Sequence, residues 1–323
     1  MLIFAAETSC DETSICLMEN KEIIKHTIFS QEIHGKFGGV IPELASRSHL
    51  QILQKITHDI FSDITFNPKN IDIFTATCGP GLAGCLLVGS TFVKSLAIGY
   101  KKPFVPMNHL EGHLLSTSFN NTIDYPQIVM LLTGGHTQIY FMNNETSVEL
   151  IGESVDDALG EAFDKVAKLI GLPYPGGAEL EKKAKLGDEN FFKLPKPMTK
   201  EKSLNFSFSG IKTHISLMVK KNEINNEFIY NLSASFQKNI CDILNLKLSL
   251  AIENMKQKGI NIQSVSIVGG VANNKYIKKK LEDNAKKNKI KIFFPIKEMI
   301  SDNAAMIAWA CNKNYNKNKE NLY

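Results

Sequence analysis

The alternation of apolar and polar positions predicts the same order of elements twice along the chain. Each half has three strands, a helical segment, a strand, a helix and a last strand. In the first half these lie at 2–8, 14–19, 22–30, 42–61, 72–79, 82–99 and 103–107. In the second they lie at 127–134, 137–143, 147–153, 157–258, 264–270, 273–287 and 290–295, and a helix at 301–311 closes the chain. The halves share topology without sequence identity, which predicts an α/β protein whose halves enclose a cleft.

Four turns rich in glycine or hydroxyl residues are expected to face that cleft. Glycine pairs allow backbone N–H groups to approach an anion. Each turn alone is compatible with ordinary turn chemistry, but four together indicate a binding cleft. The turns are "ETSCDET" at 7–13, "TGGHTQ" at 133–138, "YPGGAELEKKA" at 174–184 and "IVGGVANNKY" at 267–276.

Composition narrows the class of protein. With 323 residues, 43% of them apolar, the chain can bury a large core, and a net charge of +4 does not by itself imply nucleic acid. Six cysteines without a CxxC pair suggest reduced thiols in the cytoplasm. The start lacks the basic region of a signal peptide, and the most apolar stretch, 82–100, carries polar and glycine residues, so no membrane span is expected. The lysine-rich run at 275–291 is expected to be a solvated helix face.

Two histidines, His109 and His113, have the spacing of metal ligands. Four residues along a helix bring both imidazoles to the same side, although a plain polar helix face has the same spacing. The peptidase motif HExxH is absent, because the glutamate is the third letter and not the second. Glu111 is about 200° round the helix from His109 and so cannot flank the same metal. Asp302 can supply a third ligand, its alternative role being a helix N-cap.

Nine segments between Glu7 and Trp309 carry a family resemblance. They are "ETSCDET" (7–13), "GGVIPELASRSH" (38–49), "GPGLAGCLLVG" (79–89), "NHLEGH" (108–113), "TGGHTQ" (133–138), "DDALGEAFDKVAKLIGLPYPGG" (156–177), "NFSFSGIKT" (205–213), "GGVANN" (269–274) and "SDNAAMIAW" (301–309). Together they resemble the universal tRNA N6-adenosine threonylcarbamoyltransferase family. The resemblance implies an actin-like, sugar-kinase-like and Hsp70-like ATPase fold of two related lobes around a nucleotide cleft. We assign the N-terminal lobe to residues 1–106 plus 303–323, and the C-terminal lobe, with a helical insertion, to 107–302.

The resemblance also implies a reaction and its residues. A threonylcarbamoyl group would pass from threonylcarbamoyl-AMP to N6 of adenosine 37 in tRNAs that read ANN codons, with release of AMP. The family's metal ligands fall on His109, His113 and Asp302, for one divalent metal per subunit, Fe2+ in preference to Zn2+. Asp11 and Glu12 are candidates to orient or deprotonate the attacking amine, with turn stabilisation as their alternative role. Asp164 could accept hydrogen bonds from the ribose hydroxyls. Asn274 aligns with the family's asparagine, and the neighbouring Asn273 is the alternative. The adenylate contacts fall on Leu132, Thr133, Gly134, Gly135, His136, Asp164, Gly177 and Asn274.

Partners follow from the same resemblance, which is to the bacterial type. They are tRNA, a non-catalytic paralogue and a small ATPase, in the cytoplasm and without a membrane. Three other functions are alternatives. A metallopeptidase is disfavoured by the place of Glu111. A kinase or ATPase of this fold would hold magnesium through carboxylates and phosphates instead of a histidine pair. A non-catalytic scaffold is disfavoured because all three metal ligands are present. The metal's identity, the proton acceptor and the tRNA surface stay open.

Overall fold

The computed structural model describes residues 1–36, 39–63 and 66–318, and its chain divides into two compact units. Unit 1 comprises Met1–Asn120 and Pro295–Tyr323, and unit 2 comprises Asn121–Phe294. The lobe boundaries expected from the sequence are 106/107 and 302/303. The difference arises because helix α3 (His109–Ser116) packs on helix α9 (Ala304–Asn318), where Trp309 Nε1 donates to the Leu115 carbonyl at 3.1 Å. Both histidines and Asp302 therefore belong to unit 1.

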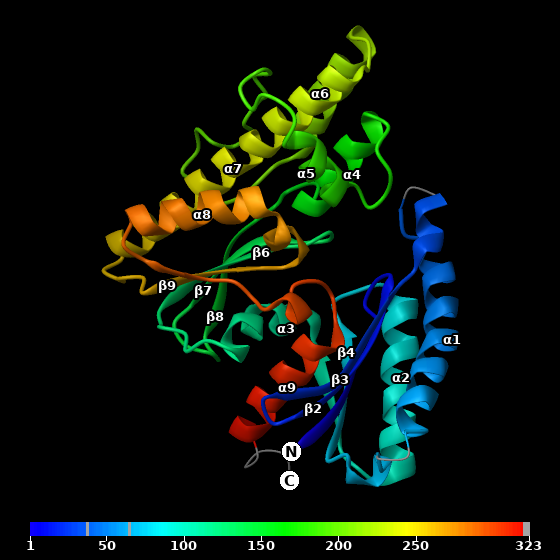
Figure 1. Ribbon diagram of the computed structural model, residues 1–323. Helices are drawn as coiled ribbons and strands as arrows, with labels where there is room; N and C mark the ends of the chain where they lie inside the picture. Colours follow the sequence, from blue (N-terminus) through cyan, green and yellow to red (C-terminus); the bar gives the residue numbers. More distant parts are fainter. Residues whose placement is uncertain (37–38, 64–65, 319–323) are drawn as a thin grey trace. The chain divides into compact units, whose positions relative to one another are not determined.

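Unit 1 is built on a five-stranded mixed sheet. Its strands are β1 (Leu2–Glu7), β2 (Glu12–Glu19), β3 (Glu22–Ser30), β4 (Ile73–Gly79) and β5 (Phe104–Asn108), in the order β3-β2-β1-β4-β5. The first three strands are antiparallel and β1, β4 and β5 are parallel. Helices α1 (Pro42–Phe61) and α2 (Ala83–Tyr100) cover one face, and α3 and α9 lie on the other (Figure 1).

Unit 2 repeats this sheet. Its strands are β6 (Gln127–Leu132), β7 (Thr137–Met142), β8 (Val148–Glu153), β9 (Ser264–Val268) and β10 (Lys291–Phe293). Their order, β10-β9-β6-β7-β8, read backwards matches unit 1 strand for strand. The predicted repeat of topology is thus confirmed. The helical segment predicted at 157–258 resolves into α4 (Leu159–Leu169), α5 (Gly176–Ala184), α6 (Ser209–Lys221) and α7 (Asn226–Gln257), with a long loop between α5 and α6.

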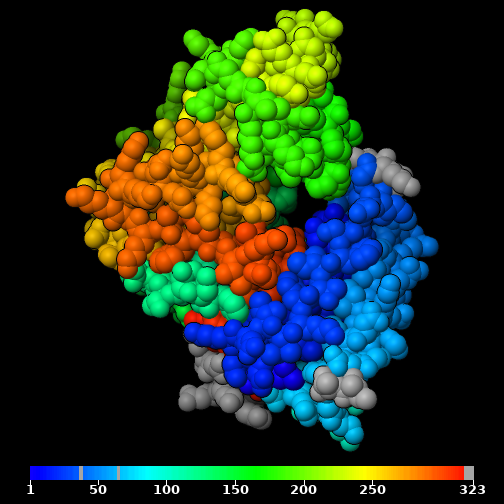
Figure 2. Space-filling model, in the orientation of Figure 1, coloured from blue at the N-terminus to red at the C-terminus, as the bar shows by residue number. Residues whose placement is uncertain are grey.

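The lysine-rich run forms α8 (Lys275–Lys287), whose amphipathic pattern explains its position on the sheet. Ile277, Leu281 and Ala285 are fully buried at helical spacing, and the lysines Lys275 and Lys279 are exposed. Figure 2 shows this orange segment at the surface of unit 2. The prediction of a solvated helix face is confirmed, although the helix begins two residues later than expected, after an N-cap at Asn274.

Among the described residues, α2 alone has the length and composition of a membrane span. Its mean hydropathy is 1.4, and 22% of its residues are buried. The buried ones, Cys85, Gly89, Val93 and Ala97, recur at helical spacing and face the core of unit 1. Leu87 and Ile98 are 66% and 70% exposed. One helix of this kind does not establish a membrane protein, because core helices of soluble proteins meet the same criteria.

Candidate functional site

Three potential metal donors converge in unit 1. Both histidines lie on α3, which begins where Asn108 Oδ1 accepts the N–H groups of Leu110 and Glu111. His113 Nε2 lies 3.0 Å from one Asp302 carboxylate oxygen, and His109 Nε2 lies 3.6 Å from the other. All three donor atoms lie within 4.8 Å of one another. The four-residue spacing thus has the predicted effect, and Asp302 joins the pair from 189 residues away.

This donor set fits a divalent metal ion. Ligand atoms around a tetrahedral ion at 2.0–2.1 Å stand roughly 3.3 Å apart, which matches the separations of Asp302 from both imidazoles. Three protein ligands leave a position open for substrate or water. Glu111 takes no part, because its Oε1 accepts a hydrogen bond from Asn314 on α9 at 2.7 Å. The geometry therefore agrees with the expectation that Glu111 does not serve as the base of a peptidase.

Glu7 is a member of this site that the sequence did not reveal. Its carboxylate is completely buried and accepts hydrogen bonds from Ser9 N, Thr77 Oγ1 and His109 Nδ1, the last at 3.1 Å. Since a carboxylate only accepts, Nδ1 carries the proton and His109 directs Nε2 at Asp302. Carboxylates commonly hold metal-binding histidines in this way. The one available signal was an acid at the carboxyl end of an otherwise apolar strand.

The buried charges around the site shift the protonation of both histidines. Against the opposing effect of burial, Asp302 and Glu7 raise the pKa of His109 to about 9. Burial lowers the pKa of His113, so its imidazole stays neutral, as a metal ligand must be. A metal ion must displace the Nε2 proton of His109, so metal and proton compete for this nitrogen.

We expect Glu7→Gln to weaken metal binding about 10- to 100-fold, the usual effect of losing a carboxylate behind a histidine ligand. Glutamine keeps the size of the side chain but removes the charge that fixes His109. Competition with a metal-sensitive chelator measures the dissociation constant. Glu111→Gln is the matched control, since Glu111 is an acid on α3 that bonds to Asn314 instead. An unchanged dissociation constant in Glu7→Gln would show that the carboxylate does not support the ligand.

Asp11 and Glu12 lie at the turn between β1 and β2, next to the metal donors. Burial, followed by the neighbouring carboxylates of Asp302 and Asp11, raises the pKa of Glu12 well above its ordinary value. A carboxyl group with a raised pKa is a common feature of sites that transfer protons. The structure thus brings the two predicted acids to the metal donors, all within unit 1.

The predicted adenylate-binding turn, Leu132–His136, connects β6 to β7 in unit 2. Thr133 N–H donates to the His136 carbonyl at 2.8 Å, and His136 N–H donates to Thr133 Oγ1 at 2.9 Å. Gly134 and Gly135, at its tip, are exposed. The turn is therefore closed by its own hydrogen bonds and presents its glycines outward.

Two glycines outside this turn leave room for it. A Cβ on Gly160, the second residue of α4, would lie 2.8 Å from Gly134 Cα. A Cβ on Gly269, which has a φ of +94°, would lie 2.5 Å from the Leu132 carbonyl oxygen. Neither position was predicted to act on the turn. Their effect is visible only once the fold brings α4 and the end of β9 against it.

The remaining predicted contacts make hydrogen bonds within unit 2. Asp164 Oδ1 accepts the Gly176 N–H at 2.7 Å, so this oxygen holds the start of α5, next to Gly177. Asn274 Oδ1 caps α8, and its Nδ2 donates to Gln237 Oε1 at 2.9 Å. Adenylate binding by these residues stays a prediction. Asn273, its neighbour, is exposed.

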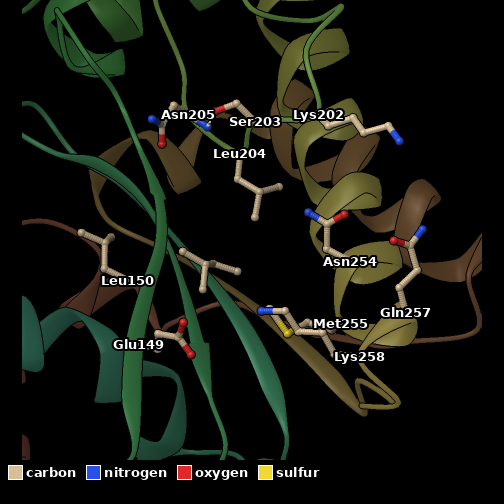
Figure 3. A pocket seen from close by; sticks show the side chains of 11 residues that line it. Glu149, Leu150, Lys202, Ser203, Leu204, Asn205, Asn254, Met255, Gln257 and Lys258 are labelled. Atoms are coloured by element: carbon tan, nitrogen blue, oxygen red, sulfur yellow. Dashed lines mark hydrogen bonds between the residues drawn. The ribbon is translucent and has the colours of Figure 1, made fainter.

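Two cavities lie in unit 2. One of about 120 Å3 is lined by Gly135 and His136 of the turn, together with Glu153 and Asp156. Another of about 590 Å3 lies between β8 and the end of α7, where Leu150, Leu204 and Met255 side chains line it (Figure 3). The second contains no predicted site residue. The first cavity lies beside the expected adenylate-binding turn, because Gly135 and His136 line it.

Solved structures with the same fold are distant in sequence. Full-length HypF, in its phosphate- and nucleotide-bound form, has a TM-score of 0.61 at 14% identity, over 97% of this chain and 46% of its own. Component A of (R)-2-hydroxyglutaryl-CoA dehydratase from Acidaminococcus fermentans has a TM-score of 0.53 at 14% identity, over 97% and 99%. These similarities establish the actin-like ATPase fold expected from the sequence.

Sequence relatives are much closer. A tRNA N6-adenosine threonylcarbamoyltransferase of Thermosipho africanus is 43% identical over 98% of this chain and 95% of its own. One of Rickettsia rickettsii is 43% identical over 97% and 93%. The family model described as tRNA N6-adenosine threonylcarbamoyltransferase matches residues 22–309. The chain therefore belongs to the tRNA N6-adenosine threonylcarbamoyltransferase family.

Proposed function

We propose that the chain transfers a threonylcarbamoyl group from threonylcarbamoyl-AMP to N6 of adenosine 37 in tRNAs that read ANN codons. Membership of the family supports the reaction class. The observation that carries the chemistry is the convergence of His109, His113 and Asp302 beside the acidic turn of Asp11 and Glu12. A peptidase is not favoured, because Glu111 bonds to Asn314.

We propose one divalent metal per subunit, Fe2+ in preference to Zn2+, with His109, His113 and Asp302 as ligands. When bound, the ion supplies a Lewis acid for the phosphate or carbamoyl oxygens of the adenylate. Glu7 holds the His109 ring in the orientation that directs Nε2 at Asp302. The buried surroundings of His113 keep that ligand in place and limit access of water.

Asp11 and Glu12 are proposed to act on the attacking amine. As the new bond forms between N6 and the carbamoyl carbon, the bond from that carbon to the phosphate oxygen breaks and AMP leaves. One N6 proton passes to a carboxylate of the turn. The raised pKa of Glu12 favours Glu12 as this acceptor and Asp11 as the orienting group.

The turn at 132–136 is proposed to bind the adenylate. Backbone N–H groups of a glycine-rich turn can hold a phosphate or a developing oxyanion without reorganisation. Its exposed Gly134 and Gly135, and the cavity beside Gly135 and His136, are consistent with this role. Asp164, Gly177 and Asn274 complete the proposed contacts.

The proposed partners are tRNA, a non-catalytic paralogue and a small ATPase, in the cytoplasm. Family membership supports tRNA as the acceptor. The exposed apolar side chains of Leu87 and Ile98 on α2 are of the kind that protein partners bury. No membrane is required for this set of partners.

Reconstitution tests the function. The metal-loaded chain, a tRNA that reads ANN codons and threonylcarbamoyl-AMP made in situ should yield threonylcarbamoyl-adenosine at position 37, detected by mass spectrometry of digested tRNA. The same tRNA with guanosine at position 37 is the control and should stay unmodified. Absence of product with the metal, the paralogue and the ATPase all present would refute the proposed function.

A further inference from the structure

The segment "GGVIPELASRSH" (38–49) is prominent in the sequence, yet the proposed chemistry uses none of it. Its last residue, His49, lies on α1 and is completely buried. Its Nε2 lies 2.9 Å from the Cys10 carbonyl oxygen, and its Nδ1 lies 2.7 Å from Thr13 Oγ1. Cys10 immediately precedes Asp11, and Thr13 immediately follows Glu12. One rigid ring therefore contacts both ends of the two-acid segment.

The chemistry of these contacts fixes the proton on His49. A carbonyl oxygen can only accept, so Nε2 must donate to Cys10. In the neutral ring Nδ1 is then an acceptor, and its one lone pair is shared by the Thr13 hydroxyl at 2.7 Å and Gln31 Nε2 at 3.3 Å. Gln31 Nε2 also donates to the Ala45 carbonyl at 3.3 Å. Burial lowers the pKa of His49, in agreement with a neutral ring.

Gln31 and His34 extend this arrangement into a continuous hydrogen-bonded chain. Gln31 Oε1 lies 3.0 Å from His34 Nε2, and His34 Nδ1 lies 3.3 Å from the Ile41 N–H at the start of α1. The Ile41 N–H can only donate, just as the Cys10 carbonyl can only accept. Every bond between them must therefore run in one direction, from Ile41 through His34, Gln31 and His49 to Cys10. Gln31 also donates its backbone N–H to the Asp11 carbonyl at 3.2 Å.

We propose that His49, supported by Gln31 and His34, is a positioning residue that holds the turn of Asp11 and Glu12 in its reactive geometry. A support is needed because Glu7, Asp11, Glu12 and Asp302 bring several carboxylates together, and like charges repel. The ring anchors the backbone on both sides of the acids without touching substrate itself. This role rests on the proposed function of the two acids.

The first test reads the tautomers in the full chain without any substrate. Nitrogen-15 NMR of histidine-labelled protein should show His34 and His49 as neutral rings protonated on Nε2. Substitution of each histidine in turn assigns its signals. A His49 ring protonated on Nδ1, or on both nitrogens at pH 7.5, would contradict the directed chain and overturn the proposal.

The second test separates positioning from folding. His49→Leu removes both hydrogen-bonding atoms and should lower kcat about 10- to 100-fold, as expected when reacting groups are misplaced by about 1 Å. The KM for threonylcarbamoyl-AMP and the metal content should change less than about twofold. His49→Gln, which has a donor and an acceptor, should recover most of kcat. His58→Leu is the matched control, because His58 lies on α1 with a side chain 79% exposed.

The outcomes are distinct. Wild-type kcat in His49→Leu would overturn the proposal, as would a loss in which metal content falls equally and glutamine restores nothing. If His49→Leu does not fold, Gln31→Leu takes its place, with the same expected loss of kcat and the same contrary result. A wild-type chain that transfers nothing would refute the proposed function, whereas the tautomer measurement would still decide whether the chain of hydrogen bonds exists.

Discussion

His113→Ala should abolish stable metal binding and lower the rate of transfer to tRNA by more than about 100-fold. This loss exceeds the usual effect of removing a residue that only supports a metal ligand. His113 is completely buried and supplies one of three converging donors. With alanine, only His109 and Asp302 remain, which is too few for a stable site. Metal bound per chain, determined by elemental analysis after dialysis, and single-turnover transfer measure the two effects.

The control is His58→Ala, which removes an exposed histidine from α1. It should keep wild-type metal content and rate. A matched measurement of thermal unfolding shows whether the His113 variant remains folded in the absence of metal. Retention of both metal and transfer in folded His113→Ala would show that the three donors are not the metal site.

Gly269→Ala should lower the affinity for AMP at least about 10-fold through its effect on the turn at Leu132–Thr133. The φ of +94° is strained for alanine, by about 1–2 kcal/mol. The new Cβ would in addition lie 2.5 Å from a backbone oxygen that cannot rotate away. The turn must shift, and its donors then no longer match the ligand. Isothermal titration with AMP measures the change.

Gly270→Ala is a close control, since no atom lies within 4 Å of the added Cβ. It should bind AMP as the wild type does. Equal loss of affinity in both variants would indicate a general disturbance of the segment, and unchanged affinity in Gly269→Ala would show that the turn at 132–136 does not bind the adenylate.

Local patterns in the sequence were sufficient to predict the β-strands and the repeated topology of the two halves. Runs such as "LIFAAE" and "QIVMLL" are so apolar that their burial in a sheet follows from composition. The spacing of His109 and His113 fixed their common direction, because it depends only on helix geometry. Asp302, in contrast, is only one possible third ligand until the family resemblance assigns it, since no local pattern indicates a contact across 189 residues.

Residues whose role depends on a neighbour in space were missed. Glu7 resembles the end of a strand until His109 is placed beside it. Gly160 resembles an ordinary helix residue until Gly134 is found against it. The lobe boundaries differed for the same reason, because the packing of α3 on α9 is a contact between distant segments. Single-sequence patterns carry no information on such contacts.

The contact between His113 and Asp302 also joins two distant segments of the chain. The chain leaves unit 1 after Asn120 and returns at Pro295. His113 lies before the exit and Asp302 after the return, so their contact joins these two segments within unit 1. It closes a loop that contains all of unit 2. Because the entropy cost of closing a loop grows only slowly with its length, insertions in unit 2 should have little effect on this contact.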